Sequence, residues 1–172
     1  MRVRETLSAF ASVAILSLAT ATMGAQGTGG SSDSADVTEV RNYALTLDKA
    51  QKAATAMQSI NQMIVANPSL NAALDASSGT TGKETITQQA QYIDSKYPQI
   101  STVIHANGLE TREFIVITGA IINDVGFVGM KEQGIISSYP PNSITPANAT
   151  LIEGNWAAFQ SIAAKMTPPN SN

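Results

Sequence analysis

Apolar side chains recur every three or four positions through most of the chain from residue 47 onward, the spacing of one face of an α-helix. This pattern predicts long helices over about 47–66, 82–97, 111–131 and 146–166. Shorter apolar stripes follow Pro68 and Pro98, and proline favours the first position of a helix. The sequence therefore predicts an all-α fold, a compact helical bundle of four long helices plus two short proline-initiated helices.

Residues that begin and end helices punctuate this pattern. The N-terminal signals are Thr46, Asn67, Thr145 and the pair Thr81 and Glu84, which has capping-box spacing; the C-terminal signals are Asn107-Gly108 and Gly134. The segment 135–143 is predicted to be an irregular connection. The segment Glu39–Leu45 fits either an extended lead-in or an early helical turn, and the sequence leaves both open.

The two short helices resemble each other. Residues 67–76 align with residues 97–106 at an offset of 30, and the proline, both core aliphatic residues and the final alanine coincide. A duplicated unit of long helix, proline step and short helix is one explanation. Convergence on the same capping chemistry is the other, and either predicts similar local geometry in the two copies.

The third long helix has the composition of a central helix. Residues 114–130 are apolar on nearly every side, as in a helix that others surround. Gly119, Gly126 and Gly129 each cost about 1 kcal/mol against alanine inside a helix. Gly119 and Gly126 are seven residues apart and share a face, so we expect a neighbouring helix to approach there.

The N-terminus has the layout of a secretory signal peptide over residues 1–25. Arg2 and Arg4 precede the apolar run Leu7–Leu18, and small residues follow it. Ala19-Thr20-Ala21 supplies an A-x-A cleavage site and Met23-Gly24-Ala25 a second, less ideal one, and the sequence leaves both open. The run is short for a bilayer span, which takes about 20 apolar residues, so we predict an exported product, periplasmic or extracellular, with no stable membrane anchor after cleavage.

Composition sets further bounds. The predicted organisation is a flexible Gly/Ser linker over 26–36, a single helical domain over 37–167 and a disordered tail over 168–172. The chain has no cysteine, which excludes disulfides and a lipid-modified cysteine. Its net charge is −3, and the mature part has no Lys/Arg cluster, so nucleic acid is not an expected partner.

Three residues are candidates for facing a ligand: Asn123, Asp124 and Trp156. Asn123 and Asp124 interrupt the apolar third helix and could form a polar site in the core. The competing interpretation puts Asp124 on a narrow exposed stripe and has Asn123 bonded to a neighbouring backbone. Trp156 could stack on a ligand ring, although its place in a helical stripe is typical of a core residue.

No catalytic, cofactor-binding or metal-binding residues are predicted. The single histidine, His105, has no second histidine or cysteine to form a metal site or to activate a hydroxyl, so a structural or surface role is expected. The segment Gly79–Lys83 lacks the spacing of a phosphate-binding loop. Asn148-Ala149-Thr150 is a formal glycosylation sequon, a match that is common by chance.

Three short segments, Tyr43–Lys49, Gly108–Phe114 and Thr145–Asn148, carry a resemblance to a family of uncharacterised exported bacterial helical proteins. That family has no assigned activity, so the resemblance implies export and a helical fold but no function. Glu110 stands where a serine-like helix cap is the family's pattern.

The absence of catalytic groups favours a non-enzymatic helical module that binds a partner protein or a small apolar ligand. An envelope structural or assembly protein is the alternative. A hydrolase that uses Asp124 with Arg112 or Lys131 is a third hypothesis.

Overall fold

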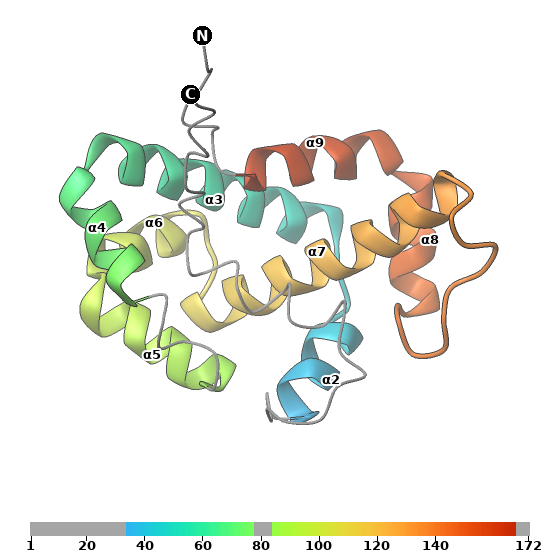
Figure 1. Cartoon of the computed structure of the whole chain (residues 1–172), viewed down its shortest axis with the longest axis horizontal. Helices are drawn as coiled ribbons and strands as arrows, with labels where there is room; N and C mark the ends of the chain where they lie inside the picture. The colour runs from blue at the N-terminus through green and yellow to red at the C-terminus, as the bar shows by residue number, and fades with distance from the viewer. Residues whose placement is uncertain (1–33, 78–83, 168–172) are drawn as a thin grey trace, which may run out of the picture.

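The computed structural model describes residues 34–77 and 84–167, and the fold within these ranges is entirely helical (Figure 1). No strand occurs in the described residues. The helices are α2 (Ser34–Asn42), α3 (Leu47–Ala66), α4 (Pro68–Ser77), α5 (Ile86–Lys96), α6 (Pro98–Ala106), α7 (Thr111–Glu132), α8 (Pro146–Gly154) and α9 (Trp156–Met166). The predicted all-α class is confirmed.

Helix α7 lies at the centre, as its composition predicts. It packs against α2, α3, α5, α6, α8 and α9, and Phe114, Ile117 and Ala120 are completely buried. Among the described helices it alone is long and apolar enough to cross a bilayer, but 61% of its most apolar window is buried inside the protein. In this structure, the other helices cover the apolar surface of α7.

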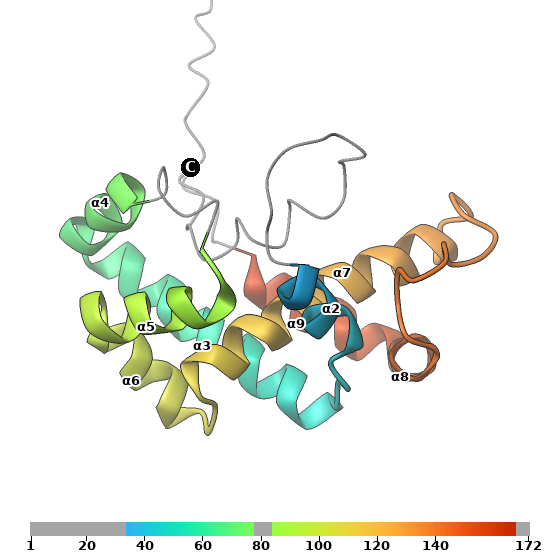
Figure 2. The same cartoon turned by 90° about the horizontal axis from the view of Figure 1, so that it is seen from below.

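The second layer is formed by α3 and α9, which run side by side above α7 in Figure 1. Helix α3 buries Ala50, Ala53, Ala54 and Ala56, whose small side chains let neighbouring helices come close. Seen from below, α4, α5 and α6 gather at one end of the molecule and α8 stands at the other (Figure 2). The two ends are joined by α3 and α7.

Most predicted helix ends are confirmed. The Thr46 hydroxyl accepts a hydrogen bond from the backbone N–H of Lys49. Gly108 and Gly134 have φ of 74° and 71°, in the left-handed region that favours glycine. The capping-box prediction is wrong: α5 begins at Ile86, and its box is formed by Thr85 and Gln88. Thr85 and Gln88 have the same capping-box spacing as Thr81 and Glu84, so spacing alone does not show which threonine begins the helix.

The two proline steps have the predicted similar geometry. Asn67 and Tyr97, which precede Pro68 and Pro98, both have φ of −129°. The aligned pairs Leu70 with Ile100 and Leu74 with Ile104 are all buried. The capping differs, because the Asn67 side chain accepts from the Leu70 N–H whereas Tyr97 makes no side-chain cap.

Two predicted boundaries are wrong. Residues Ser34–Asn42 form α2, so the end of the predicted linker is helical. In the segment that follows the linker, the residues up to Asn42 are also helical and not an extended lead-in. The fourth long helix is broken: α8 ends at Gly154 and α9 begins at Trp156, with Asn155 between them at ψ of 32°. Within the described residues, only α3 and α7 have 20 residues or more. The signal peptide of 1–25, the segment 79–83 and the tail of 168–172 lie outside the described residues.

Candidate binding groove

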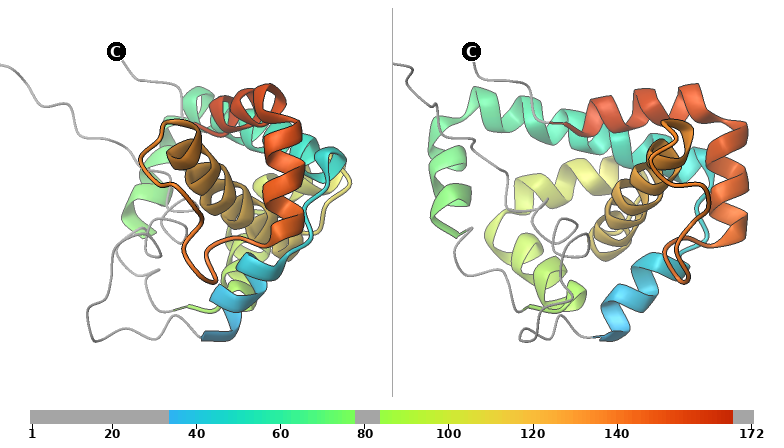
Figure 3. Two further views of the ribbon diagram at one scale, coloured as in Figure 1. Left: turned by 90° about the vertical axis from the view of Figure 1, so that its right-hand side faces the viewer. Right: turned by 45° about the vertical axis from the view of Figure 1, so that its right-hand side comes forward.

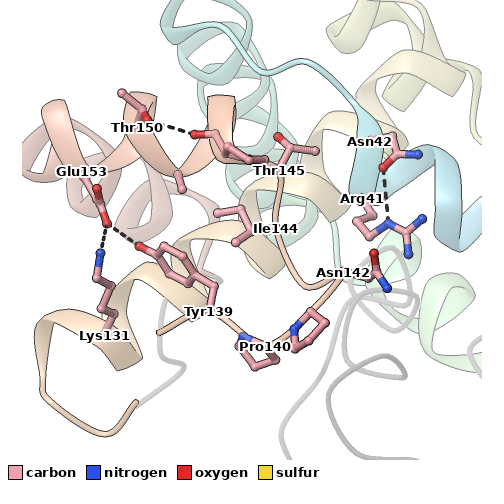
Figure 4. A pocket seen from close by; sticks show the side chains of 13 residues that line it. Arg41, Asn42, Lys131, Tyr139, Pro140, Asn142, Ile144, Thr145, Thr150 and Glu153 are labelled. Atoms are coloured by element: carbon pink, nitrogen blue, oxygen red, sulfur yellow. Dashed lines mark hydrogen bonds and ion pairs between the residues drawn. The ribbon is translucent and has the colours of Figure 1, made fainter. Parts of the chain in front are cut away.

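The end of α2, the connection between α7 and α8, and α8 itself come together at one side of the molecule (Figure 3). A groove lies between them (Figure 4). We call it the α2–α8 groove. Its walls are Arg41 and Asn42 of α2, Lys131 of α7, residues 139–142 and 144 of the connection, and one face of α8 from Thr145 to Glu153. Its cavity volume of about 610 Å³ is in the range of small-ligand sites.

At one end of the groove, the charged side chains pair with each other. Lys131 Nζ lies 2.6 Å from Glu153 Oε1, and the Tyr139 hydroxyl donates to the same oxygen at 2.6 Å. The Lys131 ammonium also lies 4.8 Å from the centre of the Tyr139 ring. The hydrogen bond from Lys131 lowers the pKa of Glu153, while burial and the Glu153 charge raise the pKa of Tyr139. The Lys131 and Glu153 charges at this end therefore compensate each other.

The other end carries an arginine without a counter-charge. Arg41 Nε donates to the neighbouring Asn42 Oδ1 at 3.3 Å, and the guanidinium makes no ion pair with any described residue. By contrast, both Nη atoms of Arg112 contact the Glu39 carboxylate at 2.6 Å. Figure 4 shows Arg41 across the groove from Lys131 and Glu153.

Between the two ends the lining is mainly apolar. Ile144 and Ala149 lie among Pro140, Pro141 and Pro146, whose rings restrict the backbone. Asn142, at the tip of the connection, has φ of 62°, a left-handed conformation that asparagine tolerates better than most residues. The groove thus combines a mainly apolar lining with one positive charge, that of Arg41, which has no ion-pair partner among the described residues.

Behind the groove lies a set of polar side chains that we call the buried amide network: Asn123, Asp124 and Asn148. Asp124 and Asn148 are 0% and 1% exposed. Asp124 accepts from Asn148 Nδ2 at 2.7 Å and from Asn123 Nδ2 at 2.8 Å. The interpretation that put Asp124 on an exposed stripe is wrong, because α8 covers this part of α7 and supplies the amide that Asp124 needs.

The network ties the walls of the groove together. Asn123 also donates to the Ser143 carbonyl in the connection, as the interpretation of a backbone partner for Asn123 predicts. Asn148 donates to the Tyr43 carbonyl at 2.9 Å and accepts from the Leu45 N–H at 3.1 Å. Tyr43, Ser143 and Asn148 are chain neighbours of the groove residues Asn42, Ile144 and Ala149. The network therefore fixes the three walls relative to one another.

Burial also changes the acidity of this network. Loss of water around the Asp124 carboxyl raises its pKa from 3.8 to about 6, against the opposite effect of the two amide hydrogen bonds. No charged residue contributes to this pKa shift. Both ends of the Asn148 amide are occupied inside the protein, so this sequon asparagine is inaccessible in the folded structure.

None of the three ligand-facing candidates lines the groove. Asn123 and Asp124 belong instead to the buried amide network, and no sequence pattern indicates that α8 covers them. Trp156 is half-buried at the start of α9 and packs against the core, with its Cη2 3.5 Å from the position of a Cβ on Gly129. The groove itself was missed by sequence reasoning, because its lining comes from separate segments with no motif.

A second polar cluster occurs near the start of α7. The Asp94 carboxylate accepts from the hydroxyls of Ser101 and Thr111, and His105 Nε2 lies 3.5 Å from Thr111 Oγ1. Thr111 is 2% exposed, so a substrate cannot reach its hydroxyl without local opening. His105 is exposed and 3.7 Å from Glu110 Oε2, as expected for a surface histidine. No group of three or more metal-ligating side chains occurs in the described residues.

The three segments that carry the family resemblance meet in space. Tyr43 Oη donates to Glu113 Oε1 at 2.8 Å, and Lys49 Nζ lies 2.6 Å from the same oxygen. Asn148 joins them through the Tyr43 carbonyl. No protein-family model, curated protein or solved structure matches this chain.

Proposed function

We propose that this protein is an exported, non-enzymatic helical module that binds a partner protein at the α2–α8 groove. The observation that carries the proposal is the groove itself, in which the uncompensated Arg41 stands beside a rigid apolar lining. Export is supported by the N-terminal layout of Arg2, Arg4 and the apolar run after them.

The hydrolase hypothesis finds no supporting contact. Asp124 is fully buried and bonded to amides, Arg112 is held by Glu39, and Lys131 is held by Glu153. The two basic side chains that would have assisted Asp124 are thus engaged elsewhere. A binding role requires only that the groove be open and rigid.

Photo-crosslinking from inside the groove tests the proposal. A photoreactive amino acid would replace Thr150, an exposed groove residue whose hydroxyl donates to the Pro146 carbonyl at 3.0 Å. Thr102 provides the matched control, because it is exposed, follows Pro98 by the same four residues and donates to the Pro98 carbonyl. Neither substitution removes a tertiary hydrogen bond.

The expected result, after irradiation of the native host, is a discrete adduct from position 150 and none from position 102. An adduct with twice the mass of the chain would favour the alternative of an envelope structural or assembly protein. Equal labelling from both positions, or labelling from neither, would remove the support for a binding groove.

A further inference from the structure

We infer that the α2–α8 groove recognises an acidic side chain, Asp or Glu, next to an apolar residue in an extended segment of the partner, with Arg41 as the anion receptor. This inference rests on the proposed function, because it names the chemistry of the ligand in the same groove. It is carried by the charge balance and the lining described above.

The first step concerns the charge of Arg41. Three charged side chains line the groove, and the Lys131 charge is already matched by Glu153 at 2.6 Å. Arg41 keeps its charge uncompensated within the described residues. Its Nε donates to Asn42 Oδ1 at 3.3 Å, and no described residue forms an ion pair with its Nη groups, which are the donors for a ligand. A guanidinium in this state suits a carboxylate, which it contacts through two parallel hydrogen bonds.

The second step is the surface next to that charge. Ile144 is half-buried and the prolines around it are exposed, so they offer apolar surface that gains from covering by an apolar side chain. Asn42 and Asn142 also line the groove and offer amide donors and acceptors of the kind that a peptide backbone needs. An extended acidic and apolar segment satisfies all three features.

The third step is to decide whether the partner's carboxylate belongs to a side chain or to its C-terminus. Terminal carboxylates are commonly captured by successive backbone N–H groups. The anion receptor in this groove is instead a side chain at the end of α2. We therefore commit to an internal Asp or Glu.

A random peptide display library provides the test, selected in parallel on the full-length mature protein and on three variants. Arg41→Gln removes the charge, and Arg41→Lys keeps the charge but loses the paired donors. Lys165→Gln is the matched control, because Lys165 is the basic residue in the last turn of α9 as Arg41 is in the last turn of α2.

Peptides selected on the wild type and on Lys165→Gln are expected to share an acidic residue beside an apolar one. Arg41→Gln should lose this enrichment. For one selected peptide, synthesised with acetylated and amidated ends, we expect Kd to rise at least about tenfold with Arg41→Gln. Replacing the peptide's Glu by Gln should have a similar effect, and the two changes together should fall short of additive.

Three results would overturn the inference: no enriched peptide, an enriched motif without an acidic residue, or the same acidic motif on Arg41→Gln. A motif that works only with a free C-terminal carboxylate would also contradict it. An adduct from position 150 that persists in Arg41→Gln would leave the groove as the binding site and refute only the acidic ligand.

Discussion

Asn148 joins three parts of the molecule with one side chain. Its amide nitrogen donates to Asp124 and to the Tyr43 carbonyl, and its oxygen accepts from the Leu45 N–H. Asp124 and Leu45 are buried and the Tyr43 carbonyl is part-buried, so each of these groups loses a hydrogen bond inside the protein if the Asn148 amide is removed. The sequence showed Asn148 only as part of a sequon and Asp124 only as a break in an apolar run, because neither pattern reveals a partner 24 or 105 residues away.

We predict that Asn148→Ala strongly destabilises the protein. The substitution leaves a carboxylate, a carbonyl and an N–H without their partner, and unmet buried groups cost about 1–3 kcal/mol each. A loss of about 3 kcal/mol or more is expected in urea unfolding. Asn155→Ala is the control, since Asn155 is half-buried and donates only to the Leu151 carbonyl one turn earlier. Equal losses for the two variants would contradict the bridging role of Asn148.

The buried carboxyl of Asp124 makes stability depend on pH. Its pKa is about 6 in the folded protein, above the ordinary value of 3.8. Between these values the folded protein keeps a proton that the unfolded chain has lost, so rising pH favours unfolding. The contribution is fully present below about pH 3.8 and is lost as the pH rises through about 6, on the order of 2–3 kcal/mol in all.

The measurement is urea unfolding of the wild type and of Asp124→Asn from pH 4.5 to 7.5. We expect the wild type to lose stability relative to the variant across this range, whatever the absolute stability of the variant, because asparagine does not titrate. Parallel pH profiles for the two proteins would show that the Asp124 carboxyl has the same pKa in both states.

Helix boundaries were predictable wherever a local residue sets them. Thr46 acts through a hydrogen bond to the Lys49 N–H, the prolines through their fixed φ, and Gly108 and Gly134 through a left-handed φ. All of these effects are local, so sequence spacing identifies them. Helix α2 was not predicted, because its Ser- and Asp-containing start has the composition of a linker and its contacts are with distant α7. The break at Asn155 was missed because the apolar stripe continues across it.

Two glycines of α7 have different roles, which substitution by alanine separates. A Cβ on Gly119 would lie 3.1 Å from Val40 Cγ1 of α2, tighter than ordinary contact, whereas one on Gly129 would lie 3.5 Å from Trp156. The predicted close approach at Gly119 is therefore real, and α2 is the helix that approaches.

We predict that Gly129→Ala stabilises the protein by about 0.5–1 kcal/mol through helix propensity. Gly119→Ala should gain less or lose stability, because Val40 and α2 must shift. Val40→Ala in the Gly119→Ala background should recover part of the gain, as measured by thermal unfolding. If Gly119→Ala alone were as stabilising as Gly129→Ala, α2 would not be packed closely on α7.

At the scale of the whole molecule, residues from both ends of the described chain form one site. Arg41 follows the start of the described residues closely, Glu153 lies near their end, and the central helix α7 supports both walls. The all-α class could be predicted from helical periodicity alone. The groove could not, because it depends on how α2 and α8 pack on α7, and no local pattern encodes that packing.

Export is the prediction that belongs to this scale. We expect the protein recovered from the exported fraction of its host to begin at Thr22 or at Gln26, the residues after Ala21 and Ala25. Intact mass and N-terminal sequencing would decide between the two sites. A form that retains Met1 in a membrane fraction would contradict cleavage.

Tyr43 and Asn148 are 105 residues apart in the sequence, and this separation determines how late in synthesis the groove can form. During synthesis α2 through α7 emerge first, and the last wall of the groove exists only after α8 has been made. Contacts between distant residues form late, because a long loop must close before they add stability. An incomplete chain that stops short of residue 146 lacks the α8 wall, so the groove can form only after α8 has been made.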